Sequence, residues 1–487
     1  MTDILQILRT QKDYSGEERI LKYREYQNLL KGNHQDVFSH LVSTKDTLNA
    51  HYITVNLASL IAKKQADLMF LKPVIINFQD NQDDLRFKEI AFRNEFQRLC
   101  YKQSISASAM GGCFFRLRWG LLNKYNSRKD KSGKEMNNEL IIEALNPEYV
   151  FPEIQNDRMI SCTIKYIEPT SVISQNKIQT EEYFIEEHYE PGKYYKNVYR
   201  ILQNRSGIEI ALLDMPKEMS LPFHQLPVIY IPNALENGFY GISDFDDKLE
   251  LMHEINNTLS RISSAVRRYT YPILVATEEW ITRAKAQGSC FTSVRSPIEH
   301  IRANGEHVKI RVEDIGVTAA PRDKQGHFQD VFKFIEYHPD LNGIQTHLNE
   351  CVHLFLKLTG ISPALLESGD MLSGEALKLK LTNTLVMIGA KKALWEEGLK
   401  NLASTALVMD NAYSRKNKKH SNLQGFEADN IRIDWGDTLG LFKENPLPEI
   451  IQKVSAGLMS RQTAISLLEN INEEEAFREW KRIREEM

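Results

Sequence analysis

The chain has 487 residues, of which 42% are hydrophobic, and its 61 basic and 65 acidic residues give a formal net charge of −4. This length and apolar content predict two to four structural units with large cores. The interspersed charges argue against a strongly basic protein that would hold duplex DNA by neutralising many of its phosphates.

The N-terminal half is expected to hold helices followed by short strands. The period of the apolar residues predicts a surface helix around residues 20–30 and two longer helices over Asn56–Leu71 and Phe87–Ala109. Gly111 and Gly112 are expected to end the last of these before a half-buried strand. Short apolar or alternating runs then predict an antiparallel sheet; they span 141–145, 149–152, 162–166, 183–189, 198–202 and 208–212.

A first long helix is expected from Ser243 to Tyr269. Ser243 would be its N-cap, with aspartates in the first turn and Arg267 and Arg268 in the last, which complements both ends of the helix dipole. Its apolar residues keep a near-heptad spacing with Asn256 as the polar member, which is typical of a helix that packs along others. After this helix a small α/β module is predicted, with strands at 271–277, 290–294 and 307–312 around a short helix at 278–287.

A second long helix, from Asp340 to Gly360, precedes a loop rich in helix-breaking residues and a third, longer helix. Ser373 is expected to cap this third helix, whose apolar stripe runs unbroken to Tyr413 over about 60 Å. The dozen residues between these two buried helices are interpreted as a mobile tip at the end of a stalk. The chain closes with a strand and short helices, delimited by residues 431–437, Gly457, Ser460 and Asn472.

No spacing typical of an enzyme occurs in the sequence. It contains no phosphate-binding GxxxxGK[ST], no GxGxxG after a strand, no HExxH, no GxSxG and no DxDxDG calcium loop. We therefore expect no catalytic residue, no cofactor and no metal ion. His347 and Cys351 lie four residues apart on one helix face, but two ligands are too few for a metal site, and packing is the favoured interpretation.

The remaining patterns bear on the cellular compartment of the protein and on its contacts with membranes and nucleic acids. Its five cysteines stand far apart without a CxxC pair, which predicts reduced thiols in a cytosolic setting. We find no leader peptide and no apolar run approaching ~18 residues, so neither secretion nor membrane contact is expected. The basic segment Asn123–Glu135 is interpreted as a solvated hairpin loop, with nucleic-acid contact as the less favoured alternative.

Several segments, in their order and spacing, resemble one protein family. They are NLASLIAKKQADLMFLKPVII (56–76), SAMGGCFFRLRW (108–119), EALNPEYVFPEI (143–154), LPVIYIPN and YGISDFDDKLELMHEINNTLSRI (226–262), TGISPALLESGDMLSGEALKLK (359–380), and IRIDWGD with GLMSRQTAISLLENINEEEAFREWKRIREE (431–486). Together they resemble the portal, or head–tail connector, proteins of tailed bacteriophages, of the type found in phages and prophages of Gram-positive bacteria.

This resemblance implies an α+β portal fold with wing, stem, clip and crown regions. On this sequence they fall at 1–242 (wing), 243–270 (first stem helix), 271–337 (small α/β clip), 338–360 (second stem helix), 361–372 (tunnel loop), 373–436 (long spine helix and return to the wing) and 437–487 (helical crown).

The resemblance also implies a dodecameric ring at one capsid vertex of the virion, assembled in the cytoplasm of the bacterial host. Double-stranded DNA would pass through it regardless of sequence, during packaging by the terminase and during ejection. The implied partners are the terminase large subunit, a head–tail adaptor, and the major capsid and scaffolding proteins. A near-neutral chain suits such a conduit because a basic lining would stall the DNA. Stem helices with a near-heptad apolar stripe, of which Asn256 is the polar member, would pack side by side to form the ring wall.

Candidate site residues follow from the resemblance. The DNA-facing tunnel-loop residues would be Glu367, Ser368, Gly369, Asp370, Met371 and Leu372. The candidate stem contacts with DNA are Arg261, Arg267, Arg268 and Lys357, for which a salt bridge in the ring or a helix-end charge is the alternative. The clip residues taken as partner-binding are Glu278, Glu279, Trp280 and Arg283.

Two other classes of function remain open on the sequence. The first alternative is a non-viral oligomeric scaffold or tether without a role in DNA translocation. The second is an enzyme such as a metal-dependent nuclease, which the absence of motifs disfavours.

Overall fold

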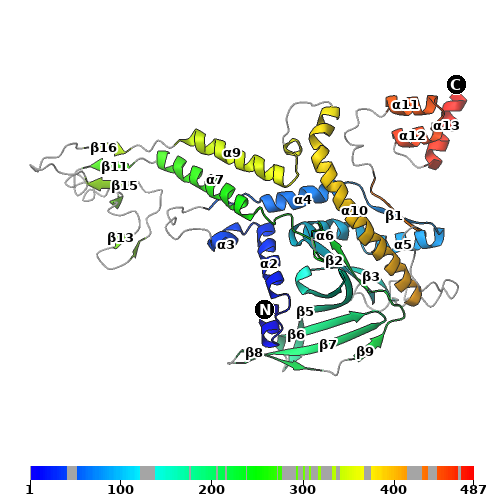
Figure 1. Cartoon of the computed structure of the whole chain (residues 1–487), viewed down its shortest axis with the longest axis horizontal. Helices are drawn as coiled ribbons and strands as arrows, with labels where there is room; N and C mark the ends of the chain where they lie inside the picture. Colours follow the sequence, from blue (N-terminus) through cyan, green and yellow to red (C-terminus); the bar gives the residue numbers. More distant parts are fainter. Residues whose placement is uncertain are drawn as a thin grey trace, which may run out of the picture.

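Figure 1 shows the computed structural model, in which a body of sheets and helices is crossed by one long helix and extended by a projecting pair of helices. A cluster of short helices near the C-terminus lies apart from the sheets. The structure describes residues 2–40, 52–120, 138–174, 177–204, 207–213, 217–236, 238–270, 273–276, 292–293, 300–301, 307–308, 316–319, 332–335, 340–366, 374–413, 430–436, 447–469 and 473–486. The mixture of helices and strands agrees with the α+β class.

The body is built on antiparallel sheets. The largest has the strand order β4-β5-β6-β7-β8, with β9 also paired to β7, while β2 lies between β10 and β3, and β1 pairs with β17. Their bounds are β1 Ile75–Phe78, β2 Gly112–Gly120, β3 Glu139–Leu145, β4 Val150–Gln155, β5 Arg158–Ser174, β6 Lys177–Glu190, β7 Lys193–Asn204, β8 Gly207–Leu212, β9 Lys217–Ser220, β10 Val228–Pro232 and β17 Ile431–Asp434. The predicted strands are confirmed, but β5, β6 and β7 extend beyond the predicted runs, and the ion pair of Arg200 with Glu181 joins β7 to β6 outside the predicted run of β6.

Helices of the N-terminal part border these sheets. They are α1 Ile4–Thr10, α2 Glu17–Lys31, α3 His34–Val37, α4 Leu57–Met69, α5 Asn81–Arg93 and α6 Phe96–Met110, with a 3-10 turn at Phe38–His40. The prediction of one helix over 87–109 is wrong, because the chain turns between α5 and α6, where Glu95 takes a φ of 49°. Buried Asn94 fixes this turn to β3: its side chain donates to Leu140 O at 3.0 Å and accepts from the N–H of Ile142 at 2.8 Å.

Helix α10, Gly374–Tyr413, crosses the body as a single helix of 40 residues, as predicted. One of its faces belongs to the largest buried apolar cluster, together with residues of β2 and β10. The fully buried Trp395 meets Phe70 and Phe115 edge to face, with ring centroids 5.2 Å and 6.2 Å away. The spine helix is therefore a core element of the body. In the part of the chain that the structure describes, no helix combines the length and apolarity needed to cross a lipid bilayer.

Helices α7, Leu249–Thr270, and α9, Leu341–Leu358, form the projecting pair in Figure 1. Beyond their far end lies a sheet of order β12-β15-β11-β16, and β13 pairs with β14. The bounds are β11 Ile273–Ala276, β12 Thr292–Ser293, β13 His300–Ile301, β14 His307–Val308, β15 Gly316–Ala319 and β16 Phe332–Ile335. Strands β11, β12 and β14 were predicted, whereas β13, β15 and β16 were not, and the expected helix at 278–287 lies outside the described residues.

The C-terminal cluster consists of α11 Leu447–Ser455, α12 Arg461–Glu469 and α13 Glu473–Glu486. Gly457, with a φ of 70°, follows α11, and the Ser460 hydroxyl accepts from the N–H of Thr463 at 3.0 Å, as an N-cap does. The helix boundaries predicted at these two residues are thus confirmed.

The close packing of α10 on β10 generates a prediction at Gly398. A Cβ added there would come within 2.4 Å of Ile231 Cγ1, so Gly398→Ala should destabilise the fold by about 1–3 kcal/mol although alanine favours helices. On the same helix, nothing lies within 4 Å of a Cβ added to Gly389, so Gly389→Ala should stabilise by up to about 1 kcal/mol. Urea unfolding of both variants measures the difference, and equal effects would contradict the close contact.

Candidate nucleic-acid interface

The projecting helices run antiparallel (Figure 1), and both contribute residues to one buried apolar cluster. Met252 and Ile255 of α7 belong to the same buried cluster as Cys351 and Phe355 of α9. Across the pair, His347 Nε2 of α9 lies 3.3 Å from Glu254 Oε1 of α7. Cys351 Sγ lies 3.6 Å from His347 Nε2, and among the described residues no group of three or more His, Cys, Asp or Glu side chains is placed to hold a metal ion.

Asn256, the polar member of the α7 stripe, is buried inside its own chain. Its Nδ2 donates to His34 Nδ1 at 3.0 Å, and its Oδ1 accepts from the N–H of Val55 at 2.8 Å. His34 Nε2 lies 3.1 Å from Leu29 O, so the neutral ring carries its proton on Nε2. Burial lowers the pKa of His34, which favours this neutral form. The polar member of the α7 stripe therefore fixes the N-terminal segment.

The first stem helix begins at Leu249 rather than at the predicted cap Ser243. Asp247 takes a left-handed φ of 62°, which interrupts the helical path between these residues. The aspartates expected in the first helical turn bind other elements instead. Asp246 pairs with Lys22 of α2 at 2.9 Å, and Asp244 Oδ2 accepts from the Ser108 hydroxyl of α6 at 2.6 Å.

Lys391 of α10 is a buried cation that joins four parts of the chain. Its Nζ donates to Asp244 Oδ2 at 2.6 Å, to Gln65 Oε1 at 2.5 Å and to Asn233 Oδ1 at 2.7 Å. These bonds use all three donors of the ammonium group. Burial lowers the pKa of Lys391, while the Asp244 carboxylate counteracts part of that shift. The spine helix is thereby tied to α4, to the segment after β10 and to the beginning of the first stem helix.

Thr384 of α10 makes a second attachment, at the end of the other stem helix. Its buried hydroxyl donates to Gly360 O at 2.8 Å and accepts from the N–H of Ser362 at 2.9 Å. Gly360 ends α9 with a φ of 67°, as predicted, and Ile361 is buried. A 3-10 turn over Pro363–Leu365 follows. The first half of the expected mobile tip is therefore anchored to the spine helix.

Thr384 and Lys391 are seven residues apart, which is two helical turns or about 10 Å along one face of α10. We call these two residues, with their partners Gly360, Ser362 and Asp244, the root clamp. It holds the end of α9 and the beginning of the segment that leads into α7. The end of α9 and the segment that precedes α7 are thus both bound to the same stretch of α10.

Sequence reasoning missed the root clamp, although a signal for it exists. Leu381, Ile388 and Trp395 repeat every seven residues on the buried stripe of α10. Thr384 and Lys391 lie on the same stripe, where a threonine and a lysine interrupt apolar residues. A polar residue on a buried face requires partners, which makes such interruptions candidates for contacts between elements.

The candidate stem cations are not brought together. Arg261 and Lys357 are both exposed, but Arg261 lines a hollow with Asp340 at the far end of the pair, whereas Lys357 lies in the last turn of α9. Arg267 and Arg268 belong to the last turn of α7, and their side chains lie outside the described residues. The charged side chains described on the two helices are Glu250, Glu254, Arg261, Glu350 and Lys357, two cations against three anions.

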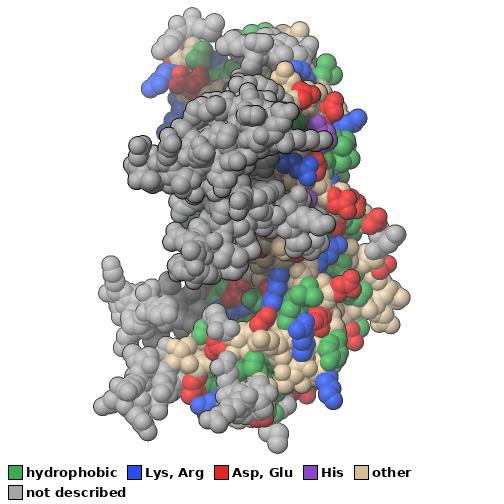
Figure 2. All heavy atoms as spheres, turned by 90° about the vertical axis from the view of Figure 1, so that its left-hand side faces the viewer, with side chains coloured by type: hydrophobic (Ala, Val, Ile, Leu, Met, Phe, Trp, Pro, Cys, Tyr) green, Lys and Arg blue, Asp and Glu red, His purple; other side chains and the backbone are tan. Residues whose placement is uncertain are grey.

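Figure 2 shows the face at this end of the molecule, where the described acidic and basic side chains are interspersed. The remaining predicted contacts lie outside the described residues; they are Glu367, Ser368, Gly369, Asp370, Met371 and Leu372 of the tunnel loop and Glu278, Glu279, Trp280 and Arg283 of the clip. Both ends of that loop are placed, Leu366 after the 3-10 turn and Gly374 at the beginning of α10.

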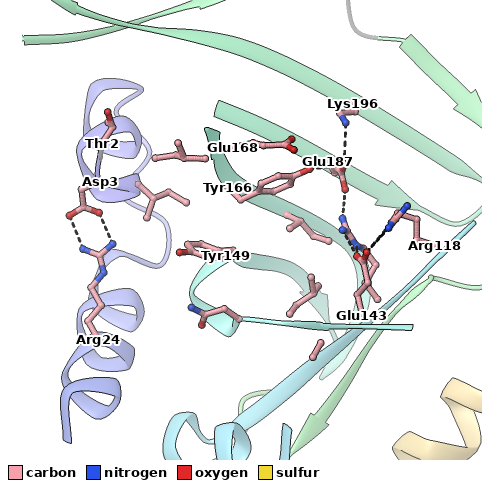
Figure 3. A pocket seen from close by; sticks show the side chains of 17 residues that line it. Thr2, Asp3, Arg24, Arg118, Glu143, Tyr149, Tyr166, Glu168, Glu187 and Lys196 are labelled. Atoms are coloured by element: carbon pink, nitrogen blue, oxygen red, sulfur yellow. Dashed lines mark hydrogen bonds and ion pairs between the residues drawn. The ribbon is translucent and has the colours of Figure 1, made fainter. Parts of the chain in front are cut away.

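A cavity of about 690 Å³ lies between α1 and strands that include β3, β5 and β6 (Figure 3). Each of its cations has a carboxylate partner: Arg24 pairs with Asp3, Arg116 with Glu143 and Glu187, Arg118 with Glu143, and Lys196 with Glu187. Burial disfavours ionisation of Glu143, yet the two guanidinium groups beside it hold its pKa below the usual value. The cavity is therefore lined by a compensated ion network that joins α1, α2 and the sheets, and it offers no unpaired cation to an anionic ligand.

Comparison with known proteins agrees with the resemblance described above. The sequence matches the family described as "Phage portal protein, SPP1 Gp6-like" over residues 5–487, a span that includes the helix pair, the root clamp and the C-terminal helices. No curated protein matches the chain. Because the family match extends over nearly the whole sequence, the chain belongs to the SPP1 Gp6-like family of phage portal proteins.

Proposed function

We propose that this chain is one subunit of a ring whose channel is lined by α7 and α9 and is narrowed by the loop 367–372. Phage portal proteins are ring oligomers of the virion capsid that handle DNA, and the family match gives no support to a non-viral scaffold. The root clamp is the observation that carries the finer assignment. It binds the end of α9 and the segment before α7 to the part of α10 that follows the loop. The loop and the helix pair are therefore attached to the body at the same place.

The charge of the helix pair supports a lining along which DNA slides. By sequence the two helices carry four cations against three anions, so the pair has little net positive charge with which to neutralise phosphates; these residues are Arg261, Arg267, Arg268 and Lys357 against Glu250, Glu254 and Glu350. Each phosphate contact releases counterions and strengthens binding, and a lining rich in such contacts would hold the duplex in place. Contacts to phosphate carry no sequence information, which suits passage of any DNA.

The other regions take their roles from the portal resemblance. In this proposal the wing is 1–242, the clip 271–337 and the crown 437–487, with stem helices and spine helix as bounded above. The clip contacts the terminase large subunit and the head–tail adaptor, and the outer surface contacts the major capsid and scaffolding proteins. The ring is a dodecamer assembled in the bacterial cytoplasm, and its subunits act without catalysis, cofactor or metal.

Electron microscopy of the purified full-length protein tests the proposal directly. We expect rings with an axial channel wide enough for a DNA duplex, and class averages give the subunit number. A monomer, or a two-fold dimer without an axial hole, would refute the assignment of α7 and α9 to a channel.

Deletion of Gly369–Met371 should leave rings intact but reduce the amount of packaged DNA, because the loop is proposed to follow the duplex at the narrowest point. Nuclease-protected DNA per particle is the measurement. Deletion of Ser132–Lys134, an equally long piece of the basic segment 123–135, serves as the matched control and should leave packaging unchanged. Full packaging by the tunnel-loop variant would remove the loop from the mechanism.

The root clamp includes the buried ion pair of Lys391 with Asp244. Lys391→Met leaves the carboxylate beside apolar atoms without its cation, so we expect a loss of about 3–5 kcal/mol in the free energy of unfolding. The double variant Lys391→Met/Asp244→Asn removes both charges and should lose less. Denaturant unfolding compares the two, and a double variant at least as unstable as the single one would argue against a charge-paired clamp.

A further inference from the structure

We propose that the C-terminal helices of one subunit dock on those of the next subunit in the ring. Leu458, in the turn between α11 and α12, would enter the apolar groove that α11, α12 and α13 form in the neighbouring copy. This inference rests on the proposed ring and names a contact within it.

The C-terminal helices do not enclose a core of their own. Among their described residues, the buried apolar side chains are Ile450, Ala464 and Ala476. Large apolar side chains that are at least 40% exposed are Ile451, Leu458, Leu467, Leu468, Phe477 and Ile483. Three short helices with so little buried apolar area are too small to be stable alone. An exposed apolar surface of this kind marks a contact with another molecule.

The groove between these helices has a volume of about 850 Å³. Val454 of α11, Ile465 of α12 and Ile483 of α13 contribute to its apolar lining. Its charged lining residues are Arg461 and Arg484, and no carboxylate is among the residues that line it. The guanidinium of Arg484 lies 5.5 Å from the centre of the Trp480 ring, which covers one side of this cation. The groove therefore fits an apolar segment that brings no positive charge.

The turn after α11 presents such a segment in a fixed conformation. The N–H of Leu458 donates to Lys453 O at 2.9 Å and the N–H of Gly457 to Val454 O at 3.1 Å, which is the hydrogen-bond pattern of a Schellman motif. In this motif the residue at the position of Leu458 usually packs on the last turns of its own helix. Here the positions it would cover are Gln452 and Lys453, and Leu458 is 82% exposed.

A second copy of this chain is the partner that fits both surfaces. The turn, Ser455–Ser460, contains no charged residue, so it matches the groove in polarity and avoids repulsion by Arg461 and Arg484. A projection that enters a different surface, the groove, of the next copy can repeat head to tail, and it gives a ring where the rotation between copies closes. A contact of one patch with itself would instead stop at a dimer. In Figure 1 the cluster lies apart from the sheets of its own chain.

Cysteine cross-linking of the full-length protein tests this contact. The variant carries Leu458→Cys in the turn and Ile483→Cys in the groove, with Cys290→Ser; the described native cysteines, Cys100, Cys113, Cys162 and Cys351, are buried. After mild oxidation, we expect a ladder of disulfide-linked oligomers longer than dimers on a non-reducing gel. A matched pair, Phe92→Cys with Ile483→Cys, uses an exposed residue of α5 and should give no ladder.

The outcomes separate this inference from the proposed function. Rings in the microscope together with cross-linked dimers only, or with no cross-links, would overturn the docking of Leu458 and leave the ring standing. A protein that forms no rings would overturn both. A ladder in the control pair equal to that of the test pair would show unspecific cross-linking and would also count against the contact.

Discussion

A charged ammonium group that leaves water must have its hydrogens bonded and a carboxylate close by, and this requirement at Lys391 determines how the stem meets the spine. Asp244 supplies the carboxylate from a segment that is not helical, although its sequence suggests a helix. In this segment the N–H of Asp244 donates to Ser108 O of α6, Asp247 adopts a left-handed conformation, and α7 begins at Leu249. The ion pair of Lys391 with Asp244 thus holds the segment before α7 against α10.

The same principle organises the wing with many weaker contacts. Arg116 lies between Glu143 and Glu187, Lys165 bonds Asp13 at 2.6 Å, and each of these pairs links elements distant in sequence. These paired charges connect strands and helices, and because each pair is neutral it adds little to the electrostatic potential around the molecule. Such pairs across the body contribute to the near-neutral total charge of the chain. This is why the composition argues against a basic DNA clamp but does not locate the proposed DNA-facing surface.

Long periodic segments could be predicted from the sequence because tertiary contacts did not compete with their patterns. This is true of α10, of α9 with its end at Gly360, and of the antiparallel strands of the wing. The break at Asn94 was missed because Phe92 and Phe96 keep helical spacing across it, although Phe92 is exposed. Strands such as β13, of two residues, are too short to show a period. At the candidate site, Ser243 carried a strong capping signal, but its hydroxyl donates to Ala109 O of α6 at 2.6 Å and α7 begins only at Leu249. The only signal at Thr384 was a polar residue on a buried stripe. Its partners, Gly360 and Ser362, lie more than twenty residues away along the chain, a distance at which a single sequence shows no pairing.

The spacing of the two attachments has a mechanical consequence. The second stem helix of 18 residues extends about 27 Å from an attachment base that is only about 10 Å wide. In the proposed ring, these proportions would make the helix pair a lever on a short base. Force applied at the far strands would act as a torque on Thr384 and Lys391, with a smaller displacement at the loop. Rotation of every helix pair by the same angle would then open or narrow the proposed channel together, with each α10 as the pivot.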